Sequence, residues 1–198
     1  MRKGKTFIVS GPSGVGKSTV LQALMERRKN VYFSVSATTR EPRPGEVDGV
    51  HYHFLDVDTF RSWIAKDEFL EYAEYVGNFY GTPKRFVDDA MNRGLDVILD
   101  IEVQGAIQVT GKRSDAVRIF IAPPSWAELE RRLTERGTDS LEKIQKRLLR
   151  AKVEFQTAHT YDYFVINDSV DNAVEELNAI MTAEHCKPKE RMEIISGR

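Results

Sequence analysis

One short stretch near the N-terminus combines residue types and spacing that suit the binding of phosphate groups. It matches the pattern G-x-x-x-x-G-K-[ST], in which glycines let the backbone curl until successive N–H groups point at phosphate oxygens. A helix that starts at this point adds its partial positive charge. Lys17 then reaches the β- and γ-phosphates of a nucleotide, and the Ser18 hydroxyl helps to hold Mg²⁺. The stretch consists of Gly11, Pro12, Ser13, Gly14, Val15, Gly16, Lys17 and Ser18.

Asp100 is a candidate partner of this loop. It ends the apolar run Val97–Leu99, and an acidic residue at the carboxyl end of a buried strand reaches Mg²⁺ directly or through water. Many strands end in aspartate as a turn residue, so the metal assignment depends on the phosphate loop being present. An ordinary glycine-rich turn, in contrast, explains neither Lys17 nor the strand and helix patterns on either side of the loop.

The loop from Ser36 to Glu46 carries a second set of groups suited to an anion. Arg40 and Arg43 lie among proline and glycine, and two guanidinium groups held in this way suit bidentate capture of a phosphate. Tyr52 and Tyr80 offer hydroxyl donors to the same anion. For either tyrosine taken alone, a half-buried structural role is the better interpretation.

Composition narrows the class of protein. The chain has 198 residues, 41% apolar and 30% charged, with a net charge of −1, so nothing global points to nucleic acid or an anionic membrane. Cys186 is the only cysteine, which excludes an intrachain disulfide and suits a reducing compartment such as cytosol. No segment approaches the roughly 20 apolar residues of a membrane helix. We find neither the N-K-x-D nor the D-x-x-G motif that a GTPase requires. A motor or AAA-type ATPase is normally larger or carries further machinery, so a small kinase is the remaining class of P-loop protein.

Short apolar runs alternate with helical patterns, which is typical of a parallel α/β sheet. Strands are predicted at Thr6–Val9, Val31–Val35, Val97–Leu99, Val117–Ile121 and Phe164–Ile166. Helices are predicted after Gly16 and at about 140–159 and 170–185, with another that a capping box of Ser125 and Glu128 opens and that runs to Arg136.

Residues 36–81 depart from this alternation of strands and helices, which predicts a small insertion. It has a short alternating strand at Tyr52 and Phe54, a helix at about Val57–Lys66, a strand at Phe69–Val76 and a tight turn at Gly77-Asn78. Thr82 is expected to cap the next helix, with Pro83 in its first position.

These residues together resemble the guanylate kinases, in collinear order from about Lys5 to Glu184. The stretches that carry the resemblance are 11–19, 34–40, 42–46, Phe69–Tyr72, Gly77–Thr82, Leu99–Gly105, Ile121–Ser125 and Glu135–Thr138. Thr82 stands where serine is often found and Glu102 where aspartate is frequent, and both keep the functional group.

The resemblance implies one domain over residues 1–198 in three parts. The P-loop core is a three-layer α/β/α structure with a parallel five-stranded sheet, over 1–35, 83–125 and 160–186. A small mixed β/α insertion, 36–82, binds the nucleoside monophosphate, and a helical lid covers about 126–159. The implied reaction transfers the γ-phosphoryl group of Mg-ATP to GMP, giving ADP and GDP in purine nucleotide metabolism.

The resemblance also assigns residues to GMP. Glu71 is implied on the guanine edge, where a carboxylate accepts the adjacent N1–H and N2–H₂ groups, which adenine lacks. Without the resemblance, Glu71 is an ordinary strand glutamate that faces water. The implied GMP-binding set is Ser36, Arg40, Arg43, Glu46, Tyr52, Glu71, Tyr80, Thr82, Asp100 and Glu102.

On the donor side, the resemblance matches arginines that fold over the phosphates. Periodicity alone favours a solvated helical hairpin in this region. Lys17, Arg136 and Arg147 are implied to oppose charge on the transferring group, with Ser18 and Asp100 on Mg²⁺. The implied ATP-binding set is Gly11, Pro12, Ser13, Gly14, Val15, Gly16, Lys17, Ser18, Thr19, Arg132, Asn167 and Asp168.

Two other functions compete with this interpretation. A non-catalytic scaffold of the same fold is disfavoured by the intact Lys17-Ser18 pair. A kinase for AMP or dTMP would contradict the role of Glu71. The expected partners are the small molecules ATP and GMP, without nucleic acid or membrane, in the cytoplasm. Oligomeric state and the use of dGMP stay open.

Overall fold

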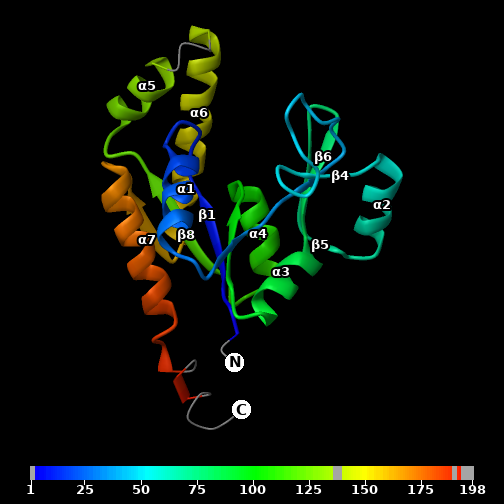
Figure 1. The fold of residues 1–198 in the computed structure, drawn as a ribbon. Coiled ribbons are helices and arrows are strands. Elements are labelled where there is room, and N and C mark those ends of the chain that lie inside the picture. Colours follow the sequence, from blue (N-terminus) through cyan, green and yellow to red (C-terminus); the bar gives the residue numbers. More distant parts are fainter. Residues whose placement is uncertain (1–2, 136–139, 189–190, 193–198) are drawn as a thin grey trace. The chain divides into compact units, whose positions relative to one another are not determined.

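The computed structural model describes residues 3–135, 140–188 and 191–192 (Figure 1). They fall into two compact units, which we describe in turn. The first unit contains Lys3–Ile8 and Asn30–Val117, and the second contains Val9–Lys29 and the chain from Arg118 onward. The predicted subdomain boundaries at 36–82 and 126–159 stay predictions.

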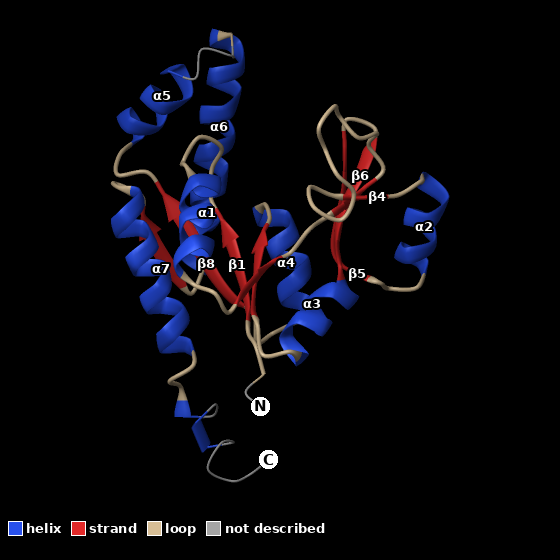
Figure 2. Cartoon of the chain, in the orientation of Figure 1, coloured by secondary structure: helices blue, strands red, loops and turns tan. Residues whose placement is uncertain are grey.

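The main sheet has five strands and confirms the expected parallel α/β class (Figure 2). Its strand order is β2 (Val31–Phe33), β7 (Asp96–Asp100), β1 (Thr6–Ser10), β8 (Val117–Ala122) and β9 (Tyr163–Ile166). All five residues of β1 are buried, as the continuous apolar run of a parallel strand predicts. The second strand ends at Phe33 and not at Val35, although the Ser34 N–H still donates to the Ile98 carbonyl at 3.0 Å.

A second, mixed sheet of four strands lies in the first unit. Its order is β4 (His53–Phe54), β3 (Ala37–Thr38), β6 (Asn78–Pro83) and β5 (Phe69–Tyr75), with β3 parallel to β4 and the other pairs antiparallel. Helix α2 (Val57–Ala65) packs against it. Phe60 of α2 is fully buried and stacks on Phe69, with ring centroids 4.3 Å apart.

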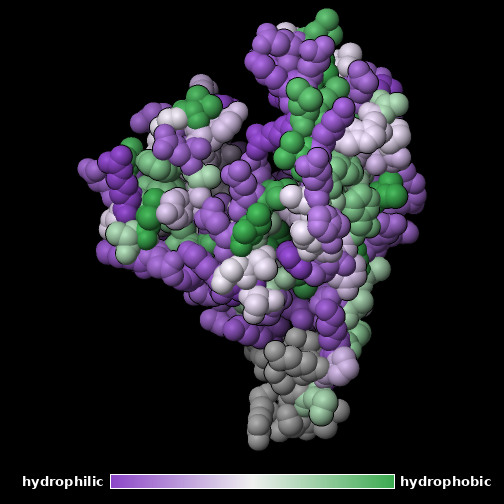
Figure 3. Space-filling view, turned by 180° about the vertical axis from the view of Figure 1, so that it is seen from behind, coloured by the Kyte–Doolittle hydropathy of each residue, from purple (hydrophilic) through white to green (hydrophobic). Residues whose placement is uncertain are grey.

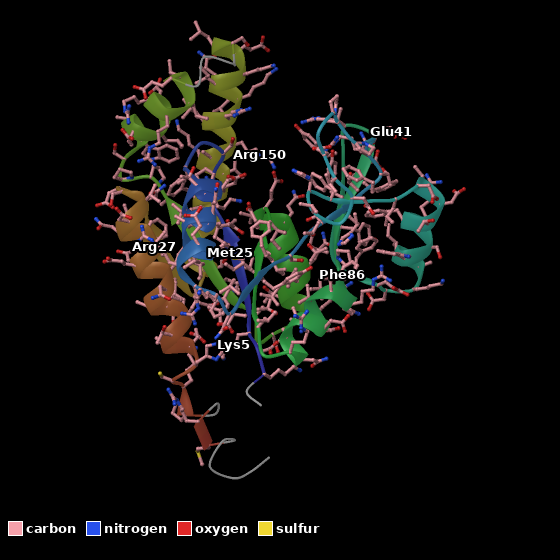
Figure 4. All side chains as sticks on the ribbon, in the orientation of Figure 1. Lys5, Met25, Arg27, Glu41, Phe86 and Arg150 are labelled. Carbon is pink, nitrogen blue, oxygen red and sulfur yellow. The ribbon has the colours of Figure 1, made fainter. Side chains whose placement is uncertain are left out.

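Two further helices complete the first unit. Helix α3 (Lys84–Asn92) packs against β7, and helix α4 (Val103–Lys112) packs against β5. Phe86 of α3 stacks on His53 of β4 with centroids 4.3 Å apart (Figure 4). This contact ties the small sheet to α3.

The hairpin between β5 and β6 turns one residue earlier than the sequence predicts. Tyr75 pairs with Asn78, so the turn residues are Val76 and Gly77, with φ values of 49° and 72°. A two-residue hairpin turn of type I′ needs positive φ at both central positions. The predicted turn at Gly77-Asn78 is therefore wrong by one residue, since Asn78 already belongs to β6.

The start of α3 is also displaced by one residue from the prediction. Pro83 is the N-cap, and the helix begins at Lys84. Thr82 belongs to β6, and its hydroxyl donates to the Glu71 carboxylate at 2.6 Å. The expected cap is therefore wrong, because a tertiary partner uses the threonine hydroxyl.

The second unit combines α1 (Lys17–Arg27), α5 (Trp126–Glu135), α6 (Leu141–Thr157), a 3₁₀ turn at Ala158–Thr160 and α7 (Val170–Glu184). Helix α1 packs on α7, and Arg27 contacts Asp171 of α7 (Figure 4). Apolar side chains of α5 and α6 form a small core of Leu129, Leu133, Ile144 and Ala151.

The predicted capping box of α5 is half formed. The Ser125 hydroxyl accepts a hydrogen bond from the Glu128 N–H at 3.1 Å. The Glu128 carboxylate bonds Arg131 and Arg132, which are the stronger, charged partners.

Hydrophilic side chains cover most of the face seen in Figure 3, with hydrophobic residues in small separated groups.

We expect Phe60→Ala to lower the free energy of unfolding by about 3–5 kcal/mol, because it removes a fully buried ring and leaves a cavity. Urea unfolding measures the difference. Tyr75→Ala, at a ring that is 64% exposed, is the control and should change stability by less than about 0.5 kcal/mol. Equal effects of the two substitutions would contradict the assignment of Phe60 to the core.

Candidate active site

The phosphate-binding loop connects β1 to α1, as the sequence predicts. Helix α1 begins at Lys17, directly after Gly16. Gly14 and Gly16 have φ values of 89° and 90°, a region that favours glycine. A Cβ at Gly14 would lie 2.6 Å from Leu133, and one at Gly16 would lie 2.6 Å from the Asn167 side chain. The backbone conformation therefore favours glycine at both positions, and a side chain there would also displace Leu133 or Asn167.

Side chains distant in sequence hold the curled loop at Val15. Its carbonyl accepts hydrogen bonds from Asn167 Nδ2 at 2.7 Å and from Arg132 Nη1 at 3.0 Å. Arg132 also donates to the Asn167 carbonyl at 3.0 Å and to Glu128 Oε1 at 2.7 Å. Arg131 and then Arg132 lower the pKa of Glu128 to about 2, so this carboxylate stays charged.

The structure places two other residues predicted for the ATP side, one at the phosphate loop and one at the start of α7. Arg147 of α6 contacts the Ser13 hydroxyl at 3.3 Å, which brings it to the phosphate loop. The Asp168 carboxylate accepts from the Ser169 N–H at 2.6 Å and from the Asn172 amide, so it supports the start of α7. Arg136 lies outside the described residues.

Glu46 organises the arginine loop of the first unit. Arg40 Nη2 donates to both carboxylate oxygens of Glu46, at 2.8 and 2.9 Å, and the Arg43 N–H donates to Oε2 at 2.8 Å. The hydrogen bond from Arg40 lowers the pKa of Glu46 below its usual value. Arg40 also donates to the carbonyl of Glu41, which Figure 4 labels in this loop. Glu46 thus fixes the guanidinium of Arg40 and the backbone at Arg43.

Two predicted tyrosines lie beside Arg40. The Arg40 guanidinium carbon is 5.5 Å from the Tyr52 ring centroid, and Tyr52 meets Tyr80 edge to face at 6.1 Å. The hydrogen bond to Glu46, and to a smaller extent one that Arg40 donates to the Tyr80 hydroxyl oxygen, raise the pKa of Arg40. The structure therefore brings Arg40, Tyr52 and Tyr80 into one cluster.

Glu71 is 8% exposed and does not face water as a regular strand would predict. The pairing of β5 with β6 shifts between Phe69 and Glu71, where Pro83 and then Thr82 lie opposite. Such a bulge re-aims the side chains that follow it, and Phe69, Leu70 and Glu71 are all buried in succession. Glu71 Oε1 accepts from the Thr82 hydroxyl at 2.6 Å.

Burial raises the pKa of Glu71 above its usual value, and the nearby charge of Glu102 raises it further. Glu102 is the N-cap residue of α4, and Asp100 ends β7 as expected. Ser36 accepts a hydrogen bond from the His53 N–H through its backbone carbonyl at 2.9 Å. These residues lie in the same unit as Glu71.

Gly105 and Gln108 of α4 received no role from the sequence. The Gln108 amide bonds the backbone of Tyr72, next to Glu71, and the nearest atoms to a Cβ at Gly105 belong to Glu71. The sequence pattern predicted no helix at Val103–Lys112, so neither residue could be placed against β5 before the structure.

The fold and the loop together define a P-loop phosphotransferase. The sheet is parallel α/β, a glycine-rich loop after β1 opens a helix, and that helix starts with a lysine and a serine. The second sheet adds an arginine–tyrosine cluster and a buried carboxylate.

Comparison with known proteins narrows this class. The guanylate kinase family model matches residues 3–184, and the chain belongs to the guanylate kinase family. It is 54% identical over 182 residues to a guanylate kinase of Thermus thermophilus, covering 92% of this chain and 82% of that protein. It is 51% identical over 189 residues to one of Carboxydothermus hydrogenoformans, covering 96% and 93%. A crystal structure of guanylate kinase from Anaplasma phagocytophilum matches with a TM-score of 0.74 and 33% identity, over 95% of this chain and 89% of that one.

Within the described residues, the helices are too short or too polar for any of them to cross a membrane.

We expect Glu71→Gln to stabilise the protein in the absence of nucleotide, by an amount that depends on pH. Because burial raises the pKa of Glu71 in the folded chain, ionisation of this group opposes folding. The opposition is absent below the ordinary glutamate pKa of about 4.3 and complete above the raised value. The parent should therefore lose stability relative to the variant as the pH rises through this window.

Urea unfolding of both proteins between pH 4 and 8 measures this difference. Glu74→Gln, at an exposed position of the same strand, is the control. A parent that gains stability relative to Glu71→Gln as the pH rises would contradict the sign of the shift.

Proposed function

We propose that this chain is a guanylate kinase that transfers the γ-phosphoryl group of ATP to GMP, giving ADP and GDP. Membership of the family supports the reaction. The buried Glu71 carboxylate is the observation that supports guanine as the preferred nucleobase. Guanine presents N1–H and N2–H₂ side by side, and an ionised carboxylate accepts both. Adenine presents a bare N1 acceptor there, which repels the carboxylate.

Thr82 prepares Glu71 for this contact. Its hydroxyl occupies one acceptor position of Oε1 at 2.6 Å, which fixes the carboxylate plane. Each carboxylate oxygen has two lone pairs, so acceptor positions remain for two donors of the base. GMP would then satisfy a buried charge that the protein alone satisfies only in part.

The arginine–tyrosine cluster of the first unit is proposed to hold the GMP phosphate. Arg40, Arg43, Tyr52 and Tyr80 supply cationic and hydroxyl donors, which suit a phosphate dianion. Glu46 keeps the Arg40 guanidinium oriented through two hydrogen bonds. We assign Glu46 to the support of these arginines rather than to direct contact with an anion, because a carboxylate repels phosphate.

The ATP phosphates are assigned to the backbone amides of the loop and to Lys17. Arg147, which contacts Ser13, lies where it can oppose charge on the γ-phosphate. Arg132 and Asn167 act through Val15 by keeping the loop curled. The oxygens of Ser18 and Asp100 are hard donors of the kind that Mg²⁺ prefers, so these two residues would hold the ion. When bound, Mg²⁺ neutralises charge on the β- and γ-phosphates.

Phosphoryl transfer requires that the protein position the two nucleotides and neutralise the charge on the transferring group. An oxygen of the GMP phosphate attacks the γ-phosphorus in line with the departing ADP oxygen. No general base is needed, because the attacking phosphate is already ionised. Lys17 and the lid arginines, Arg136 included, would oppose the charge that spreads over the transferring group. The cytoplasm is the proposed compartment, and ATP and GMP are the proposed partners.

A coupled assay of ADP release with a panel of acceptors tests the proposal. We expect GMP to be preferred over AMP by roughly 10⁴-fold in kcat/KM, because AMP leaves the buried Glu71 unpaired. Including dGMP and dTMP in the panel reports the range of acceptors. Absence of GMP-dependent ADP release would refute the activity, and a preference for AMP would refute the role of Glu71.

Lys17→Ala should reduce kcat by roughly 10²–10³-fold, because the lysine stabilises charge that develops in the transition state. Steady-state kinetics measure the loss, and thermal unfolding should show an unchanged midpoint. Lys29→Ala, at an exposed position beyond α1, is the control and should retain full turnover. Near-normal turnover of Lys17→Ala would contradict the assigned role.

A further inference from the structure

Two residues on one face of α4 contact β5 at the position of Glu71. Gly105 and Gln108 are three residues apart, so they lie on the same side of the helix about one turn from each other. Both contacts join segments more than 30 residues apart in the sequence.

Gln108 takes the place of a neighbouring strand. Strand β5 is at the edge of its sheet, so the backbone groups of Tyr72 have no further strand to pair with. Gln108 Oε1 accepts from the Tyr72 N–H at 3.2 Å, and Nε2 donates to the Tyr72 carbonyl at 3.0 Å. One side-chain amide therefore satisfies both backbone groups of the residue that follows Glu71.

Gly105 leaves space for the Glu71 side chain. A Cβ built on Gly105 would lie 3.0 Å from Glu71 Oε2, 3.3 Å from Cδ and 3.4 Å from Cγ. These three nearest atoms all belong to Glu71, so the close approach concerns its side chain and not helix packing on the β5 backbone. Glycine inside a helix is destabilising relative to alanine, so its use here needs a local reason.

We infer that Gly105 and Gln108 are positioning residues that set where the Glu71 carboxylate meets guanine. Gln108 fixes the β5 backbone beside Glu71, Thr82 fixes Oε1, and the missing side chain at Gly105 leaves Oε2 its place. The inference rests on the proposed function of Glu71 as the group that reads the base. It assigns these two residues of α4 a role in specificity that acts through Glu71.

Gly105→Ala tests this inference against a matched control. Its methyl group pushes Glu71 by a few tenths of an ångström, so we expect KM for GMP to rise by about tenfold, comparable to one weakened hydrogen bond. KM for ATP should change by less than about twofold, and the unfolding midpoint should stay the same or rise, because alanine favours helix. Gly111→Ala makes the same change on α4, where a Cβ meets no atom within 4 Å, and should leave all kinetic constants unchanged.

Two further measurements separate positioning from general packing. The preference for GMP over IMP, which lacks the 2-amino group, should fall in Gly105→Ala, since the bidentate contact is misaligned. Gln108→Met keeps length and helix preference but removes the amide, and it should raise KM for GMP with KM for ATP unchanged. Equal increases of both KM values in either variant would overturn the inference, because they indicate a general structural defect.

A double-mutant cycle distinguishes this inference from the function on which it rests. In a Glu71→Ala background, Gly105→Ala should have no further effect on KM for GMP, because it acts through Glu71. Additive effects would overturn the positioning role. If Glu71→Ala itself leaves KM for GMP unchanged, the proposed role of Glu71 fails. If Glu71→Ala weakens GMP while Gly105→Ala and Gln108→Met do not, only the positioning inference fails.

Discussion

The burial of one carboxylate, that of Glu71, constrains the elements that surround it in the first unit. A buried charge with unfilled acceptor positions opposes folding, and the raised pKa of Glu71 expresses this opposition. The surrounding elements are arranged to hold the charge in place in spite of it. The β5 bulge turns the side chain inward, the β6 register brings Thr82 to Oε1, and α4 limits the position of Oε2. Under the proposed function, a base with two adjacent N–H donors would replace the lost solvation, so the feature that weakens the empty protein would also select the ligand.

The phosphate-binding loop between β1 and α1 is subject to a different constraint. There the problem is a loop whose N–H groups must all point to one side, which leaves its carbonyl groups to be satisfied elsewhere. Asn167, which directly follows β9, and Arg132 of α5 both donate to the Val15 carbonyl. Because α5 belongs to the predicted lid, a movement of that helix would also change the support of the phosphate loop. This coupling lies within the second unit and needs no new contact with nucleotide.

Much of the fold could be predicted from periodicity, and the departures have identifiable causes. The strands and helices of the main sheet follow their apolar runs, because burial on both faces imposes a strong pattern. Two errors lie where a side chain bonds a stronger partner than the backbone group that the pattern predicts. Thr82 reads as a helix cap but bonds Glu71, and Glu128 reads as half of a capping box but bonds Arg132. The hairpin turn was displaced because Val76, a β-branched residue, adopts a positive φ that its type disfavours.

The residues of the candidate site also differ in how far the sequence alone identifies them. Lys17 and the loop around it have a local motif, so the sequence alone identifies them. Glu71 has no local motif, and its assignment depended on the resemblance to a family, because a single bulge decides whether it faces water or the interior. Gly105 is harder still. Its role is the absence of a side chain opposite a residue 34 positions away in the sequence, and only the placement of α4 on β5 reveals it.

Both arginine sites share a further principle of construction. Arg40 is paired with Glu46, and Arg132 is paired with Glu128, so each guanidinium is oriented by a carboxylate before any nucleotide binds. The pairing lowers the net positive charge of each site, which weakens long-range attraction of anions. It also removes most of the entropy that an unpaired arginine loses on binding, and it holds the planar donor groups in a fixed direction. Under the proposed function, Glu46 would therefore orient a group that binds the GMP phosphate, whereas Glu128 acts through Arg132 on the curled phosphate loop.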